Sequence, residues 1–86
     1  LEIDIIAKHK EVLIIAEVKT RRSNYFGEPE EWVDKQKQKK LIQAANAYIL
    51  RNDLNLEIQF DIISIIYNDA QTKINHIQDA FNALSK

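Results

Sequence analysis

The sequence contains no cysteine and no methionine, and it has only one glycine and one proline among its 86 residues. Without cysteine the chain has no disulfide, zinc–thiolate site or thiol nucleophile, which suits the reducing cytoplasm where we expect it to work. No apolar run approaches the roughly 20 residues of a membrane span and no signal peptide is recognisable, so we expect no membrane association. The scarcity of glycine and proline leaves little room for linkers, and one small domain is therefore predicted.

The net charge of −1 gives no overall signal for nucleic acid, but the basic residues are unevenly distributed. Seven of the 12 lysines and arginines fall between positions 19 and 40: Lys19, Arg21, Arg22, Lys35, Lys37, Lys39 and Lys40. Apart from Lys19, we expect these residues to bind DNA backbone phosphates, helped by the dipole at the start of a helix. The alternative is an ordinary solvated face, because four acids lie between the basic groups. These acids are Glu28, Glu30, Glu31 and Asp34.

Hydrophobic periodicity predicts the order β-β-α-β-β-α. The first half contains strands over 2–8 and 12–19, a tight turn at His9-Lys10, a loop with Gly27 and Pro29, and a helix over 34–52 capped by Asp34. The second half contains a strand over 57–67, a turn over 68–71, a short strand over 72–77 and a last helical turn over 79–84. A strand, a long helix and a second strand imply a parallel pair with a right-handed crossover. The predicted fold class is therefore α/β with a mixed sheet.

The predicted helix has one face that suits packing on the sheet. Its apolar residues follow the helical period: Leu41, Ala44, Ala45, Tyr48 and Ile49. Gln38 lies one turn before Leu41 and extends this face toward the start of the helix. We expect the charged ends of the lysines in the first turns of this helix to lie in solvent; they are Lys35, Lys37, Lys39 and Lys40.

Three charged residues, Asp4, Glu17 and Lys19, interrupt the apolar pattern of the first two strands. A carboxylate among Ile, Val and Ala is costly unless its charge is compensated. Strand alternation places Glu17 and Lys19 on one face. A turn at His9-Lys10 makes Glu17 the diagonal neighbour of Asp4, whereas a turn at Lys10-Glu11 places the two acids directly opposite each other. In either register two acids and one amine converge on one patch.

This patch has the chemistry for phosphodiester hydrolysis. Two adjacent carboxylates repel each other and are reconciled by a divalent cation such as Mg²⁺ or Mn²⁺, with the backbone carbonyl of Val18 as a further ligand. Such an ion polarises a phosphoryl oxygen and activates water, while Lys19 can hold that water or stabilise charge on the phosphate. The alternative is a Glu17–Lys19 ion pair at a strand end, with Asp4 facing solvent at the sheet edge.

The stretches EIDIIA, EVKTRRS, FGEPEEWV, KQKK, FDII and HIQDAF together resemble the YraN-like family of uncharacterised bacterial proteins. That family is grouped with the PD-(D/E)XK nuclease superfamily and is similar to archaeal Holliday-junction resolvases. The resemblance implies a restriction-endonuclease-like fold, metal-binding acids at Asp4 and Glu17, and a catalytic lysine at Lys19. It also matches Gln38 to the family's Lys-Gln helix motif near the same site.

The chain departs from the family pattern at its N-terminus. Leu1 stands where family members usually have a glycine, and their N-terminal helix and first strand have no counterpart here. The chain opens inside a strand pattern without a methionine. We therefore expect residues 1–86 to form a single nuclease-like domain that lacks its N-terminal part. The open sheet edge could pair with a second copy, so a homodimer is one expected assembly.

The preferred hypothesis is a metal-dependent endonuclease that hydrolyses DNA, with branched and single-stranded DNA as candidate substrates. The alternative is a catalytically inactive module on the same fold that binds nucleic acid or another protein. The two histidines receive no catalytic role. His76 is expected to be structural, and His9 is expected to be an exposed turn residue.

Overall fold

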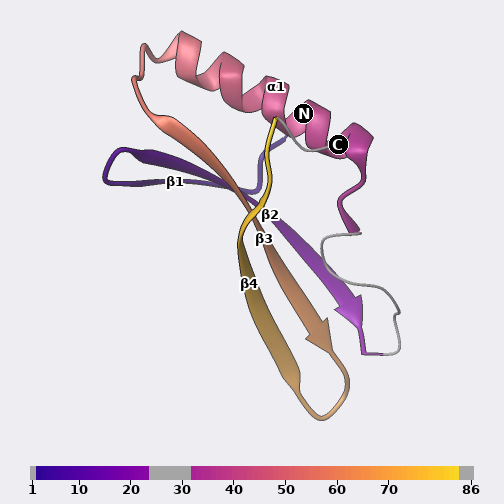
Figure 1. Ribbon diagram of the computed structural model, residues 1–86. Helices are drawn as coiled ribbons and strands as arrows, with labels where there is room; N and C mark the ends of the chain where they lie inside the picture. Colours follow the sequence, from indigo (N-terminus) through magenta and orange to yellow (C-terminus); the bar gives the residue numbers. More distant parts are fainter. Residues whose placement is uncertain (1, 24–31, 84–86) are drawn as a thin grey trace.

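The computed structural model describes residues 2–23 and 32–83, which form one mixed sheet and one helix (Figure 1). The sheet has four strands in the order β1-β2-β3-β4. Its strands are β1 (Ile5–His9), β2 (Val12–Arg22), β3 (Glu57–Tyr67) and β4 (Thr72–Phe81), and the helix α1 (Lys35–Arg51) connects β2 to β3. Strands β2 and β3 are parallel, and an antiparallel hairpin lies at each edge. The predicted α/β class with a mixed sheet is confirmed; the loop predicted around Gly27 and Pro29 lies outside the described residues.

The first hairpin adopts the second of the two registers that the sequence allows. His9 pairs with Val12, so Lys10 and Glu11 form the two-residue turn. Lys10 has a φ of 55°, a left-handed conformation that such hairpin turns commonly require. The turn predicted at His9-Lys10 is therefore wrong by one residue. The observed register, continued by one position, places Asp4 opposite Glu17.

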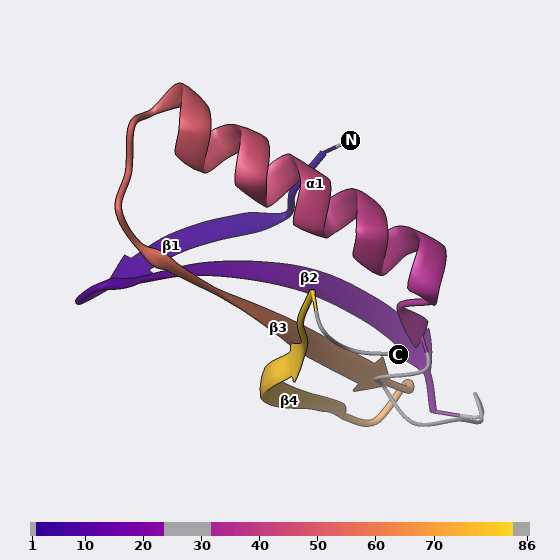
Figure 2. The ribbon, with the colours of Figure 1, turned by 45° about the horizontal axis from the view of Figure 1, so that its top comes forward.

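Helix α1 lies across one face of the sheet, with its N-terminal end beside the C-terminal end of β2 (Figure 2). Asp34 caps its first turn, because the Asp34 carboxylate accepts a hydrogen bond of 2.8 Å from the backbone N–H of Lys37. The predicted N-cap is confirmed. The helix ends at Arg51, followed by Asn52 as its C-cap, close to the predicted end.

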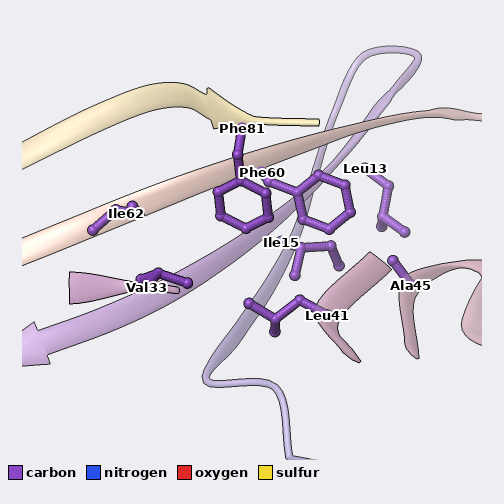
Figure 3. Packing of buried hydrophobic residues seen from close by; sticks show 8 residues of the cluster. All are labelled: Leu13, Ile15, Val33, Leu41, Ala45, Phe60, Ile62 and Phe81. Atoms are coloured by element: carbon purple, nitrogen blue, oxygen red, sulfur yellow. The ribbon is translucent and has the colours of Figure 1, made fainter. Parts of the chain in front are cut away.

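The core lies between α1 and the sheet. Its buried apolar side chains come from all elements except β1 and are shown in Figure 3: Leu13, Ile15, Val33, Leu41, Ala45, Phe60, Ile62 and Phe81. Leu13 and Ile15 alternate along β2 on the face that α1 covers. Glu17 and Lys19 continue this alternation toward the start of the helix, so the fold places them at the border of the core.

The C-terminal segment is a strand, where the sequence favoured a short strand followed by a helical turn over 79–84. Strand β4 continues to Phe81, whose ring stacks on Phe60 with centroids 5.0 Å apart. The register shifts between Phe60 and Ile62, and Asp79 has a left-handed φ of 51°. Such an irregularity bends a strand and changes which side chains face the core. The prediction of a helical turn is wrong for residues 79–81, because the bent strand turns Phe81 into the core; residue 84 lies outside the described residues.

The second face of the sheet is not covered by α1 (Figure 2). Ala16 and Asp61 are partners in the parallel ladder, and alternation turns both toward this second face. Part of this face is apolar and open to solvent, since Ile74 of β4 is 66% exposed. Within residues 2–23 and 32–83, no helix has the length and apolar character needed to cross a membrane.

Candidate active site

The carboxylate of Asp4 is held at the start of β1 by the neighbouring strand. The backbone N–H of Val18 donates a hydrogen bond of 2.9 Å to Asp4 Oδ2. A hydrogen bond between the Asp4 and Glu17 side chains, together with the Val18 N–H, lowers the pKa of Asp4 below its ordinary value. The nearby ammonium groups of Lys37 and Lys19 act in the same direction. Asp4 is therefore the more exposed member of the acid pair, and its surroundings favour its ionised form.

Glu17 is the buried member, with only 5% of its side chain exposed. Burial raises the pKa of Glu17, and both the hydrogen bond to Asp4 and the repulsion from its charge raise it further. The structure thus brings the two carboxyl groups together on one side of the sheet, as either predicted register required. Their opposite pKa shifts are typical of two acids that share one site.

Lys37 contacts this pair, which the sequence did not predict. Its Nζ lies 3.3 Å from Glu17 Oε2, and 33% of its side chain is exposed. The expectation that the charged end of Lys37 lies in solvent is wrong. The first turn of α1 passes close enough to β2 for the ammonium group to reach the buried carboxylate, which lowers the pKa of Glu17 and partly offsets the effect of burial.

The remaining residues expected at this site have different surroundings. Lys19 is half-buried on the same face as Glu17, and its positive charge contributes to lowering the pKa of Asp4. The amide nitrogen of Gln38 donates a hydrogen bond of 2.9 Å to the carbonyl of Val33. Gln38 therefore holds the start of α1, and its catalytic role stays a prediction. The same is true of the Val18 carbonyl, because the observed contact to Asp4 uses the Val18 N–H.

A divalent cation is compatible with the chemistry of these donors. Among the described residues, no group of three or more His, Cys, Asp or Glu side chains could hold a metal ion. Mg²⁺, however, is commonly bound through one or two carboxylates, with water and substrate phosphate as its other ligands. Asp4 and Glu17 supply those two carboxylates, and Asp4 is exposed enough to admit water. The donor set therefore fits a weakly held Mg²⁺ or Mn²⁺.

The predicted phosphate-binding residues divide between two faces. Arg21 shares the face of Glu17 and Lys19, and its guanidinium lies over the Trp32 ring, 5.3 Å from the centroid. Arg22 points to the opposite face, where it lies 5.1 Å from the centroid of Tyr67 and pairs with Asp69 at 3.6 Å. Arg22 therefore points away from the acid pair, because successive side chains of a strand alternate between the two faces, and its contact with a DNA phosphate stays a prediction.

The lysines at the start of α1 also differ from one another. Three of them are exposed as expected: Lys35, Lys39 and Lys40. These lysines belong to the first turns of α1, whose start lies beside the C-terminal end of β2 (Figure 2). Their contact with DNA stays a prediction.

A second buried acid lies on the opposite face and was not singled out from the sequence. Asp61 of β3 is 1% exposed and pairs with Nε2 of His76 at 2.7 Å. It also accepts hydrogen bonds of 3.0 Å from the Gln59 amide and from the backbone N–H of Asp79. Burial raises the pKa of Asp61, but these donors outweigh it and lower the pKa below its ordinary value. The group fixes the bend in β4, so the structural role expected for His76 agrees with its surroundings.

Comparison with known proteins places the chain in a family. Residues 1–65 match the uncharacterised protein family UPF0102. A UPF0102 protein of Christiangramia forsetii is 51% identical over 80 residues, which cover 93% of this chain and 67% of the relative. UPF0102 proteins of Flavobacterium psychrophilum and Clostridium beijerinckii are 49% and 48% identical, each over 93% of this chain and over 67% and 68% of the relative. The chain therefore belongs to UPF0102, the YraN-like group of uncharacterised proteins that its motifs indicated.

Proposed function

We propose that this chain is a metal-dependent endonuclease domain that hydrolyses DNA phosphodiesters on a restriction-endonuclease-like fold. One observation supports this proposal above the others: the register of β1 and β2, continued by one position, places Asp4 opposite Glu17 on the face of the sheet that also presents Lys19. The order of a hairpin, a crossover helix and a parallel strand is compatible with the β-β-α-β core that the family resemblance implies.

Asp4 and Glu17 would hold Mg²⁺ or Mn²⁺, with the Val18 carbonyl as a further ligand. When bound, such an ion would supply Lewis-acid polarisation of a phosphate oxygen and activation of water. The lowered pKa of Asp4 favours the ionised form that a cation binds. Lys19 lies on the same face, where its ammonium group would stabilise the charge that develops on the phosphate as water attacks phosphorus and the sugar oxygen departs.

DNA is the proposed substrate because phosphodiester hydrolysis suits the acid pair and because exposed lysines surround the start of α1. Lys35, Lys39, Lys40 and Arg21 would contact backbone phosphates, an interaction that positions a nucleic acid without reading its sequence. Branched and single-stranded DNA are the preferred candidates, in keeping with the resemblance to junction resolvases.

The experiment is cleavage of a DNA panel by the protein in its complete natural form. The panel contains duplex, single-stranded, flapped and four-way-junction DNA, each tested with Mg²⁺, Mn²⁺ or EDTA. We expect cleavage of at least one branched or single-stranded substrate only with metal. Glu17→Gln should reduce the rate at least about a hundredfold, because it removes the charge that binds the ion while keeping the side-chain volume.

The matched control is Glu57→Gln, which removes the same charge from an exposed position of β3. This variant should cleave like the wild type. Binding of DNA without cleavage under any condition would favour the inactive binding module. Cleavage that survives in Glu17→Gln, or that persists in EDTA, would refute the metal-dependent mechanism.

A further inference from the structure

The ion pair between Lys37 and Glu17 joins the first turn of α1 to the border of the core. Lys37 is fixed at its backbone, since its N–H donates to the Asp34 carboxylate at 2.8 Å. Its long side chain then carries the ammonium group to 3.3 Å from Glu17 Oε2. The cap of the helix thus positions a cation beside the buried acid.

Charge balance explains why a cation is needed there. Glu17 is buried and lies against the carboxyl group of Asp4, and both burial and this neighbour disfavour its ionised form. The Lys37 ammonium group opposes these effects at Glu17, and its charge also lowers the pKa of Asp4. One lysine therefore compensates both acids, as a buried charge requires.

We propose that Lys37 is a displaceable counter-ion: its ammonium group occupies the place beside Glu17 that a divalent cation would take. Cation binding would release Lys37 from Glu17 and free it to contact a DNA phosphate. This inference rests on the proposed function and extends it, because it makes one side chain couple metal binding to DNA binding.

The geometry permits such an exchange. The side chain of Lys37 is one-third exposed, so its flexible stem has solvent to move into without disturbing the buried carboxylate. An ion with two charges that contacts two carboxylates gains more from the pair than an ammonium group that contacts one. Two cations at the same carboxylate oxygens also repel each other, which favours departure of the lysine. The released ammonium group would then lie near the positive N-terminal end of α1, which favours phosphate.

The first test measures Mn²⁺ affinity by calorimetry and electron paramagnetic resonance for wild type, Lys37→Gln and Lys39→Gln. We expect Lys37→Gln to bind Mn²⁺ roughly tenfold more tightly, since the ion no longer competes with an ammonium group. Lys39→Gln removes the same charge from an exposed position and should change the affinity by less than about twofold. Equal affinities of the two variants would refute the Lys37 role, and so would weaker binding by Lys37→Gln. Absence of Mn²⁺ binding in all three proteins would refute the proposed metal site itself.

The second test keeps the sequence intact, so it remains decisive if Lys37→Gln does not fold. The ¹⁵N signal of the Lys37 ammonium group is followed by NMR during Mg²⁺ titration. We expect the signal to shift and broaden toward that of a solvated lysine, together with the side-chain carboxyl signal of Glu17. A Glu17 signal that responds while the Lys37 signal stays unchanged would show that the ion binds without displacing the lysine.

The proposed coupling between cation binding and DNA binding can be measured separately. Ca²⁺ replaces Mg²⁺ to suppress cleavage, and the affinity for a four-way junction is measured with and without Ca²⁺. In the wild type we expect Ca²⁺ to raise DNA affinity by a larger factor than in Lys37→Gln, because only the wild type gains a freed ammonium group. Equal factors in the two proteins would refute the proposed coupling.

Discussion

Asp61→Ala is expected to reduce the free energy of unfolding by about 3 kcal/mol, because the buried carboxylate is the common acceptor of three donors. Its removal leaves the Gln59 amide, the Asp79 N–H and the His76 ring without this partner. It also frees the bend through which Phe81 reaches Phe60 in the core. Chemical denaturation followed by circular dichroism measures the difference.

The matched control is Asp69→Ala, which removes an exposed acid that pairs with Arg22 at 3.6 Å. Exposed pairs of this kind contribute little, so we expect a change within about 0.5 kcal/mol. Equal stability of Asp61→Ala and the wild type would show that the second face does not depend on this acid.

The stability lost in Asp61→Ala should also depend on pH. The pKa of Asp61 is lower in the folded protein than in the unfolded chain, where it is about 3.9. Its contribution to stability is therefore fully present above that value and is lost as the pH falls through the lower pKa of the folded state. The gap in stability between wild type and Asp61→Ala should narrow below about pH 4. A gap that widens in acid would contradict the assigned direction.

Lys19→Ala is expected to reduce DNA cleavage about a hundredfold or more while changing DNA affinity by less than about threefold. Lys19 shares the face of Glu17 and its charge reaches Asp4, so its proposed action is confined to the reacting phosphate. The remaining exposed basic residues supply most of the binding. Single-turnover cleavage at saturating DNA, paired with fluorescence anisotropy, separates the two quantities.

Lys8→Ala serves as the control, because Lys8 is an exposed lysine of β1 that lies toward the hairpin turn, away from the acid pair. It should cleave and bind like the wild type. Wild-type cleavage by Lys19→Ala would refute the catalytic role, and a parallel loss of binding and cleavage would make Lys19 a binding residue.

Local periodicity predicted the regular elements well. Alternation and β-branched residues located β2 and β3, and the helical stripe that includes Leu41 and Ala45 located α1 and its buried face. The N-cap at Asp34 was also readable, because an acid before a helix has one specific backbone partner. These features depend on near neighbours in the chain.

The sequence-based predictions fail where the local sequence is compatible with more than one conformation. For the hairpin, the sequence offers two turns of similar local quality, and the observed turn gives Lys10 a left-handed φ of 55°. At the C-terminal end of β4, the Asp79 N–H donates a hydrogen bond to Asp61 and the strand bends. The spacing of apolar residues there resembles that of a helix, so the local sequence favoured a helical turn. Asp61 and Asp79 are 18 residues apart in the chain, so no short-range pattern includes both partners of this hydrogen bond.

The acid pair was predictable because both registers brought Asp4 and Glu17 to one face. The Lys37 contact was not, since it depends on how α1 is rotated above β2 and on the distance between them. The pattern around Lys37 resembles an exposed basic cluster, and only the packed helix shows that one of its members turns inward.

The central claim is that Asp4 and Glu17 together bind one divalent cation. Its most direct test is titration of ¹⁵N-labelled protein with substoichiometric Mn²⁺, because paramagnetic broadening reports distance from the ion. We predict that the amide signals around Asp4 and Val18 broaden first, and that Asp4→Asn and Glu17→Gln each remove this effect. Broadening centred on another part of the molecule, or unchanged broadening in both variants, would contradict the account.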